Sequence, residues 1–194
     1  MQQYYSLERS QEEVFPQIDF LNQKSVHSLT RDNLENIDFT YRLEKGARKT
    51  SFMSQATIRP LGMVVSKEII DLLTNQLVLC PSKITAIDNE YFWLLFDYVL
   101  EDFKWLDYRN SSFFYTEFGM REGEINLESY EDCRVKMKEL GTMSTIEVER
   151  FQLTPDFKYD VFVIPLLSRK IFVTEKAFKL FSNTELTGLS LKKI

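Results

Sequence analysis

The sequence predicts an α+β protein with a mixed, largely antiparallel sheet and a few short helices. Segments with strand and helix patterns are interleaved without the regular strand-helix alternation that a parallel sheet requires. A unit of short apolar strand, hydroxyl residue and one-sided helix also occurs twice, near residues 63–75 and 171–183. Both observations indicate that sheet and helix are mixed along one chain.

The two strand-cap-helix units follow one pattern. In the first, the apolar residues Met63–Val65 lead into Ser66; in the second, Ile171–Val173 lead into Thr174. A Ser or Thr at this position is able to accept a hydrogen bond from the free N–H groups of the first helical turn. Two interpretations stand: an internal duplication, or two unrelated strand-to-helix junctions that look alike.

The remaining elements follow from periodicity and turn residues. Tyr4 and Tyr5, together with Leu7, predict a short opening strand. The run 91–100 is apolar on both faces, which is typical of a central strand covered on both sides or of a buried helix, and its β-branched and aromatic residues favour the strand. The run 113–118 predicts another strand, and the stretch from 119 to 123, with a glycine at each end, predicts a loop.

The C-terminal half continues with a helix and several strands. Apolar residues recur at helical spacing from Ser129 to Leu140, and Gly141 predicts the end of that helix. Strands are expected at 146–153 and 161–164. Gly188 is expected to adopt the left-handed backbone that ends the last helix, before a terminal strand at 189–191.

The composition suits a folded chain with a real core. Of the 194 residues, 44% are hydrophobic and 14% aromatic, which predicts one compact domain over 1–194 or two small lobes over about 1–82 and 83–194. The formal net charge of -5 disfavours a nucleic-acid binder, because affinity for phosphate backbones needs clustered cations. No apolar run spans a bilayer, and no signal-like start is present, so a cytoplasmic location is expected.

Acidic residues gather in one stretch of the chain. They are Glu117, Glu122, Glu124, Glu128, Glu131 and Asp132. One interpretation is a solvated charged face, and another is a surface that meets the basic cleft of a partner. A third is a pair of carboxylates that perform acid and base chemistry, which requires a pairing that the sequence does not reveal.

A second polar group surrounds Trp105. Asp107 and Arg109, with Ser111, form a turn whose side chains typically bond nearby backbone groups, so a structural role competes with partner binding. Trp105 is either a core residue or an anchor for a partner, because binding hot spots are enriched in Trp, Tyr and Arg.

The sequence offers no recognisable catalytic or metal-binding motif. The sole histidine, His27, has no ligand-type neighbour at metal spacing. Phosphate loops and flanked nucleophiles of the Gly-x-Ser-x-Gly type do not occur. We therefore expect no catalytic residues, no metal and no cofactor.

Three segments together resemble a known family. They are the Trp-Leu-Asp-Tyr-Arg-Asn-Ser turn (105–111), the Thr-Ile-Glu-Val-Glu-Arg-Phe strand (145–151), and the closing Ile-Phe-Val-Thr-Glu-Lys-Ala-Phe (171–178) with Leu-Thr-Gly-Leu (186–189). The series is similar to the bacterial immunity proteins of polymorphic toxin systems, in particular the large family numbered eleven and its relatives. The likeness covers roughly Ile58 to the end.

The resemblance implies a function in competition between bacteria. A protein of this kind is a cytoplasmic antidote without enzymatic activity, which binds a cognate toxin domain and blocks it. The expected partner is that toxin domain, with neither nucleic acid nor membrane involved. A carboxylate-based hydrolase and a small-ligand binding module are the alternatives from other classes.

Overall fold

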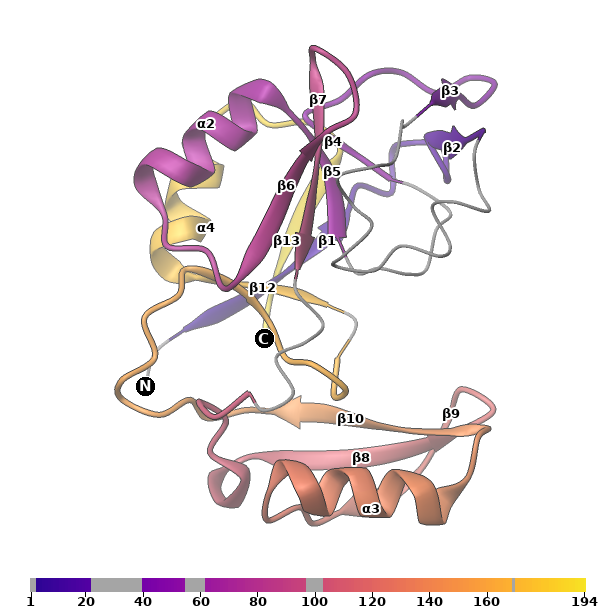
Figure 1. Cartoon of the computed structure of the whole chain (residues 1–194), viewed down its shortest axis with the longest axis vertical. Helices are drawn as coiled ribbons and strands as arrows, with labels where there is room; N and C mark the ends of the chain where they lie inside the picture. Colours follow the sequence, from indigo (N-terminus) through magenta and orange to yellow (C-terminus); the bar gives the residue numbers. More distant parts are fainter. Residues whose placement is uncertain (1–2, 22–39, 55–61, 97–102, 169) are drawn as a thin grey trace. The chain divides into compact units, whose positions relative to one another are not determined.

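The computed structural model describes residues 3–21, 40–54, 62–96, 103–168 and 170–194, which contain thirteen strands in four sheets (Figure 1). The chain divides into two compact units. Unit 1 comprises Met1–Tyr98, Tyr159–Phe162 and Ile171–Ile194, and unit 2 comprises Val99–Lys158 and Val163–Lys170. Sheets and short helices are mixed along the chain, which confirms the predicted α+β class.

Unit 1 contains two four-stranded sheets. The first has the order β4-β5-β7-β6, with α2 after β5, and the second has the order β11-β12-β1-β13, with α4 after β12. The elements of the first are β4 (Phe52–Met53), β5 (Gly62–Ser66), α2 (Lys67–Gln76), β6 (Ser82–Ala86) and β7 (Tyr91–Phe96). Those of the second are β1 (Tyr4–Arg9), β11 (Val161–Val163), β12 (Ile171–Thr174), α4 (Glu175–Ser182) and β13 (Leu189–Lys193). We call them the first and second copies.

The two copies share their strand register as well as their strand order. Ser66 ends β5 opposite Tyr91, and Thr174 ends β12 opposite Tyr4. The same alignment matches Met63 with Ile171, Leu94 with Leu7, and Ile84 with Leu191. Two unrelated strand-to-helix junctions would not be expected to agree in this way, so the structure favours an internal duplication.

The copies differ in where their third strand comes from. In the first copy β7 follows β6 directly in the chain, whereas in the second copy the equivalent strand is β1, from the N-terminal part of the sequence. The second copy is therefore circularly permuted relative to the first. The opening strand predicted from Tyr4 and Tyr5 is confirmed, and it lies at the centre of a sheet.

The copies are joined by reciprocal backbone hydrogen bonds. The N–H of Phe52, in β4, donates to the carbonyl of Thr187, just before β13 (3.0 Å). The N–H of Val161, in β11, donates to the carbonyl of Val78, just before β6 (3.3 Å). Each copy's first strand thus pairs with the segment that precedes the other copy's edge strand, as in a two-fold arrangement.

This position of β1 explains why unit 1 differs from the lobe that was predicted. The two-lobe alternative divided the chain near residue 82. Unit 1 instead continues through β7 and includes β12 and β13, because β1 pairs with both of these C-terminal strands.

Aromatic rings fill much of the core of unit 1. Phe20, in the hairpin of β2 (Ile18–Phe20) and β3 (Tyr41–Leu43), stacks on Trp93 of β7 with ring centroids 5.0 Å apart. Tyr5 stacks on Phe178 of the second copy at 4.0 Å. Apart from Phe92, every residue of β7 is buried, which confirms the doubly covered strand over 91–96, while 97–100 lie outside the described residues.

Gly188 has the predicted left-handed backbone but a different role. Its φ is +86°, yet α4 ends earlier, with Asn183 as its C-cap. A Cβ atom at Gly188 would lie 2.0 Å from the carbonyl oxygen of Phe52. The expectation that Gly188 ends the helix is wrong, because the glycine is required by its close approach to β4 at the junction between the copies.

Unit 2 is built on a three-stranded sheet with the order β10-β8-β9. Its elements are the 3₁₀ helix η2 (Tyr108–Asn110), β8 (Ser112–Glu117), β9 (Met120–Ile125), α3 (Tyr130–Leu140) and β10 (Ser144–Arg150). The predicted helix is confirmed: Ser129 caps it and Gly141 follows it with φ +89°. The predicted loop at 119–123 is wrong, since β9 covers most of it.

Candidate functional site

The β8–β9 hairpin of unit 2 has an unusual turn. Glu117 pairs with Met120, and the two residues between them, Phe118 and Gly119, have φ values of +50° and +80°. Positive φ at both central positions matches the twist of a hairpin, but the first position is normally Asn, Asp or Gly. A phenylalanine held there is strained by about 1–2 kcal/mol relative to the ordinary right-handed conformation.

Three large apolar side chains are exposed around this turn. The exposed fractions are 67% for Phe118, 63% for Met120 and 60% for Met143, and the N–H of Phe118 donates to the carbonyl of Met143 (3.1 Å). We call these three residues the apolar tip. Scattered single apolar residues on a surface are normal, but three neighbouring ones at a strained turn make this tip a candidate contact surface.

Two of the predicted acids lie next to the apolar tip. Glu117 ends β8, and Glu122 has no partner in β8 because the strand register shifts between Tyr115 and Thr116. Glu124, farther along β9 and opposite Phe114, is also exposed. The tip is therefore flanked by carboxylates on both strands of its hairpin.

The cation on β9 is already engaged within unit 2. The guanidinium of Arg121 pairs with Glu149 of β10 (2.6 Å) and lies over the ring of Phe114, 4.5 Å from its centroid. This hydrogen bond lowers the pKa of Glu149 below its usual value. Arg121 thus offsets the charge of Glu149 rather than that of the acids beside the tip.

The other three predicted acids lie at the start of α3. Glu128 and Glu131 are exposed there, whereas Asp132 belongs to the helix cap: its backbone N–H donates to Ser129 Oγ, and its carboxylate accepts from the N–H of Glu128 (3.0 Å). The latter bond, helped by Lys136, lowers the pKa of Asp132. Its position indicates a structural role.

The segment around Trp105 lies before β8 and packs into unit 2. Trp105 is half-buried and contacts the rings of Phe103 and Phe157, with centroids 5.5 and 6.2 Å away. Asp107 caps η2, because its side chain accepts from the N–H and the amide group of Asn110, and the latter bond lowers its pKa. Arg109 is exposed.

The predicted site residues do not form one surface. Strand β8 separates the η2 segment from the hairpin turn, and six residues of strand span roughly 17–20 Å. Because β9 runs back along β8, the start of α3 lies at the η2 end of the sheet, with Ile125 opposite Phe113. Glu117 and Glu122 lie at the tip end of the sheet, and Glu124 lies partway along β9. The candidates at the start of α3 and around η2 lie at the opposite end of the sheet.

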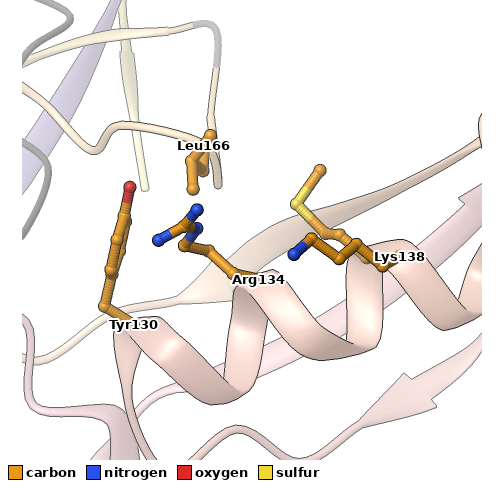
Figure 2. Close-up of a pocket in the computed structure, with 5 residues that line it drawn as sticks. Tyr130, Arg134, Lys138 and Leu166 are labelled. Carbon is orange, nitrogen blue, oxygen red and sulfur yellow. The ribbon is translucent and has the colours of Figure 1, made fainter.

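A groove runs along α3 on the same unit. It has a volume of about 250 Å³ and is lined by Tyr130, Arg134, Met137, Lys138 and Leu166. Figure 2 shows the guanidinium of Arg134 between the ring of Tyr130 and the side chain of Leu166, with the ammonium group of Lys138 one helical turn farther along. The groove therefore combines two cations with apolar walls.

Sequence reasoning missed the two features that stand out on unit 2. The apolar tip depends on Met143, which comes from beyond α3, and the groove depends on Leu166, from the loop after β11. A Phe-Gly pair is the available signal for the turn, but the glycines at 119 and 123 predict a loop where β9 lies.

Neither a metal-binding cluster nor a membrane-spanning helix occurs in the described part of the chain. These residues contain no group of three or more His, Cys, Asp or Glu side chains arranged to hold a metal ion. His27 lies outside the described residues. Among the helices that are described, none is both long and apolar enough to cross a membrane.

Comparison of the chain with protein-family models and with curated proteins gave no match.

Proposed function

We propose that this chain is a bacterial immunity protein: a cytoplasmic protein without enzymatic activity that binds a cognate, secreted or contact-delivered toxin domain and neutralises it, by occluding the active site. The resemblance of the three segments described above suggests the class. The observation that carries a binding role is the apolar tip, where Phe118 is held exposed in a strained backbone conformation.

The surroundings of the tip suit a protein interface. Interfaces combine an apolar, aromatic-rich centre with a polar rim, and the tip has such a rim in Glu117 and Glu122. A residue that breaks the local preference of its turn costs folding stability, so its side chain is expected to contribute elsewhere. The acids also favour a basic surface on the partner, as in the cleft of a nuclease.

The alternative functions have less support. A carboxylate-based hydrolase needs acids whose environments differ, but Glu117, Glu122, Glu124, Glu128 and Glu131 are all exposed to solvent. A small-ligand module would use the aromatic-rich middle of the chain as a pocket wall, yet the side chains of β7 pack against other residues of the core.

The proposal is tested first with the product of the adjacent upstream reading frame. We expect the toxin domain at its C-terminal end to co-purify with this chain and to kill cells only when this chain is absent. Failure to co-purify, together with unchanged survival when the chain is removed, would overturn the proposed function.

Substitution of Phe118 by Asn separates binding from folding. Asn is favoured at the strained position, so Phe118→Asn should raise the free energy of unfolding by about 1 kcal/mol while it weakens partner binding at least ~10-fold. Urea unfolding and calorimetric titration with the toxin domain measure the two effects. Leu21→Asn, at a 56% exposed apolar residue of unit 1, is the matched control and should leave binding unchanged.

Charge reversal tests the role of the acids. Glu122→Lys with Glu124→Lys should slow association about tenfold at low salt and flatten its salt dependence, because steering depends on the local charge. Glu128→Lys with Glu131→Lys changes the net charge equally at the other end of the sheet. Equal effects of both double variants in stopped-flow kinetics would show that only the total charge matters.

A further inference from the structure

The groove on α3 has a charge opposite to that of the protein as a whole. The chain carries a net charge of -5, yet two cations line this groove one helical turn apart, Arg134 and Lys138. Among the described residues Lys138 has no salt-bridge partner, while Arg134 contacts Glu131 at 3.4 Å. That ion pair is largely exposed, so it competes only weakly with another carboxylate.

The apolar wall of the groove is held in place by the loop after β11. Leu166 is 47% exposed and has φ +64°, whereas the neighbouring Ile164 and Leu167 are almost fully buried. Two backbone hydrogen bonds also fix the loop. The N–H of Val148 donates to the carbonyl of Leu167 (3.0 Å), and the N–H of Ser168 donates to the carbonyl of Ile164 (3.1 Å). Leu166 is therefore presented to the groove at the cost of an unfavourable backbone conformation.

The chemistry of the lining defines a ligand. Arg134 and Lys138 supply charge-assisted donors, and a guanidinium with five N–H groups is able to bind a second carboxylate beside Glu131. Met137 and Leu166 supply the apolar contact, and Met adapts readily to different shapes.

We infer that this groove binds an acidic segment of another protein, in which a carboxylate lies next to a large apolar side chain. The carboxylate contacts Arg134 and Lys138, and the apolar side chain lies against Met137 and Leu166. This inference does not depend on the toxin or on the apolar tip, because it is argued from the groove alone.

The test uses the full chain and two capped tetrapeptides, Leu-Glu-Phe-Glu and its amide counterpart Leu-Gln-Phe-Gln. In amide-resolved NMR titrations the acidic peptide should shift the signals of α3 and of residues 164–167. Loss of its carboxylates should weaken binding about tenfold or more, because each charge-assisted pair contributes on the order of a factor of ten. Arg134→Gln with Lys138→Gln should weaken the acidic peptide equally.

Matched controls keep the inference falsifiable. Lys192→Gln with Lys193→Gln, on the exposed edge strand β13, changes the net charge by the same amount and should leave the peptide affinity unchanged. Equal affinity for both peptides, or signal shifts confined to other elements, would overturn the inference. Shifts of the α3 signals with protein concentration alone would overturn it in favour of a second copy of this chain as the occupant.

Discussion

Ser66 and Thr174 occupy the same position in the two copies of unit 1, but their hydroxyl groups have different surroundings. Thr174 Oγ1 donates to Asp160 Oδ1 (2.9 Å) and accepts from the N–H of Ala177 (3.5 Å). Ser66 Oγ is buried without a hydrogen-bond partner among the described residues, and it makes no cap bond to α2. Only the second copy uses the cap that both patterns predict.

The cause is the residue at the junction. In both copies the cap N–H donates to an equivalent backbone carbonyl at 2.9 Å, that of Ser51 for Ser66 and that of Asp160 for Thr174. The Asp160 side chain also accepts from the N–H of Val78 (3.0 Å). Ser51 Oγ accepts in the same way from the N–H of Thr187 (3.3 Å), which is the residue equivalent to Val78. A serine has one side-chain oxygen and a carboxylate has two, so only Asp160 serves both the junction and the cap.

A repeated backbone therefore does not imply repeated energetics. Strand order, register and junction bonds agree between the copies, but the side-chain hydrogen bonds have diverged. Asp160 also forms an ion pair with Lys176 (2.9 Å). One carboxylate therefore contacts the junction between the copies, the helix cap and the first turn of α4. We expect the second copy to depend on this single residue more than the first copy depends on any equivalent.

The largest expected effect is that of Asp160→Ala. It leaves a buried hydroxyl and a backbone N–H without their acceptor, so the free energy of unfolding should fall by about 3 kcal/mol. Urea unfolding followed by circular dichroism measures the change. Asp71→Ala, at an exposed position of α2, serves as the control. A loss below about 1 kcal/mol for Asp160→Ala would show that the second copy does not depend on this carboxylate.

A smaller effect is expected at the two caps themselves. Thr174→Val keeps the size of the side chain but removes both of its bonds, and should cost about 1–2 kcal/mol. Ser66→Ala removes a hydroxyl that has no partner, and should be neutral or slightly stabilising. Thermal and urea unfolding of the two variants compare the caps directly. Equal losses would mean that the Ser66 hydroxyl also makes a hydrogen bond that stabilises the fold.

The smallest effect is a gain, from building the second arrangement into the first copy. Ser51→Asp supplies the missing carboxylate, and Glu68→Lys supplies the cation that Lys176 provides in the second copy. The double variant should gain about 1 kcal/mol over the original chain. Ser51→Asp alone should gain less, because Glu68 occupies the position of that cation. If neither variant is stabilised, the copies differ in more than this network.

The sequence predicted the parts of unit 1 that are local in the chain. Each strand-cap-helix unit was recognisable because its pattern spans a few turns of chain and follows helix periodicity. The insertion of β1 between β12 and β13 was not predictable, since it joins residues at opposite ends of the chain. In unit 2, β9 was missed because its exposed charges do not alternate with apolar residues and Gly123 looks like a turn residue. That glycine instead lies against the ring of Tyr115.

The candidate site was predictable only in its composition. Most of the acidic stretch is exposed, but residues that are contiguous in the sequence do not form one contiguous surface. The hairpin reverses the chain at Gly119, so the acids of β9 and those of α3 lie progressively farther from the tip. The residues that complete the apolar tip and the groove come from other segments, and no single-sequence pattern brings them together.

The permuted second copy has a consequence for biosynthesis. While the ribosome makes the chain, the first sheet acquires all four of its strands once residue 96 has emerged. Strand β1 is translated early, but its two neighbouring strands, β12 and β13, lie within residues 171–193. It therefore remains without its native partners until these residues have been translated. During that interval the tyrosine-rich strand β1 exposes backbone groups that can pair with non-native strands. In a nascent chain stalled before residue 171, β1 has neither of its native partner strands.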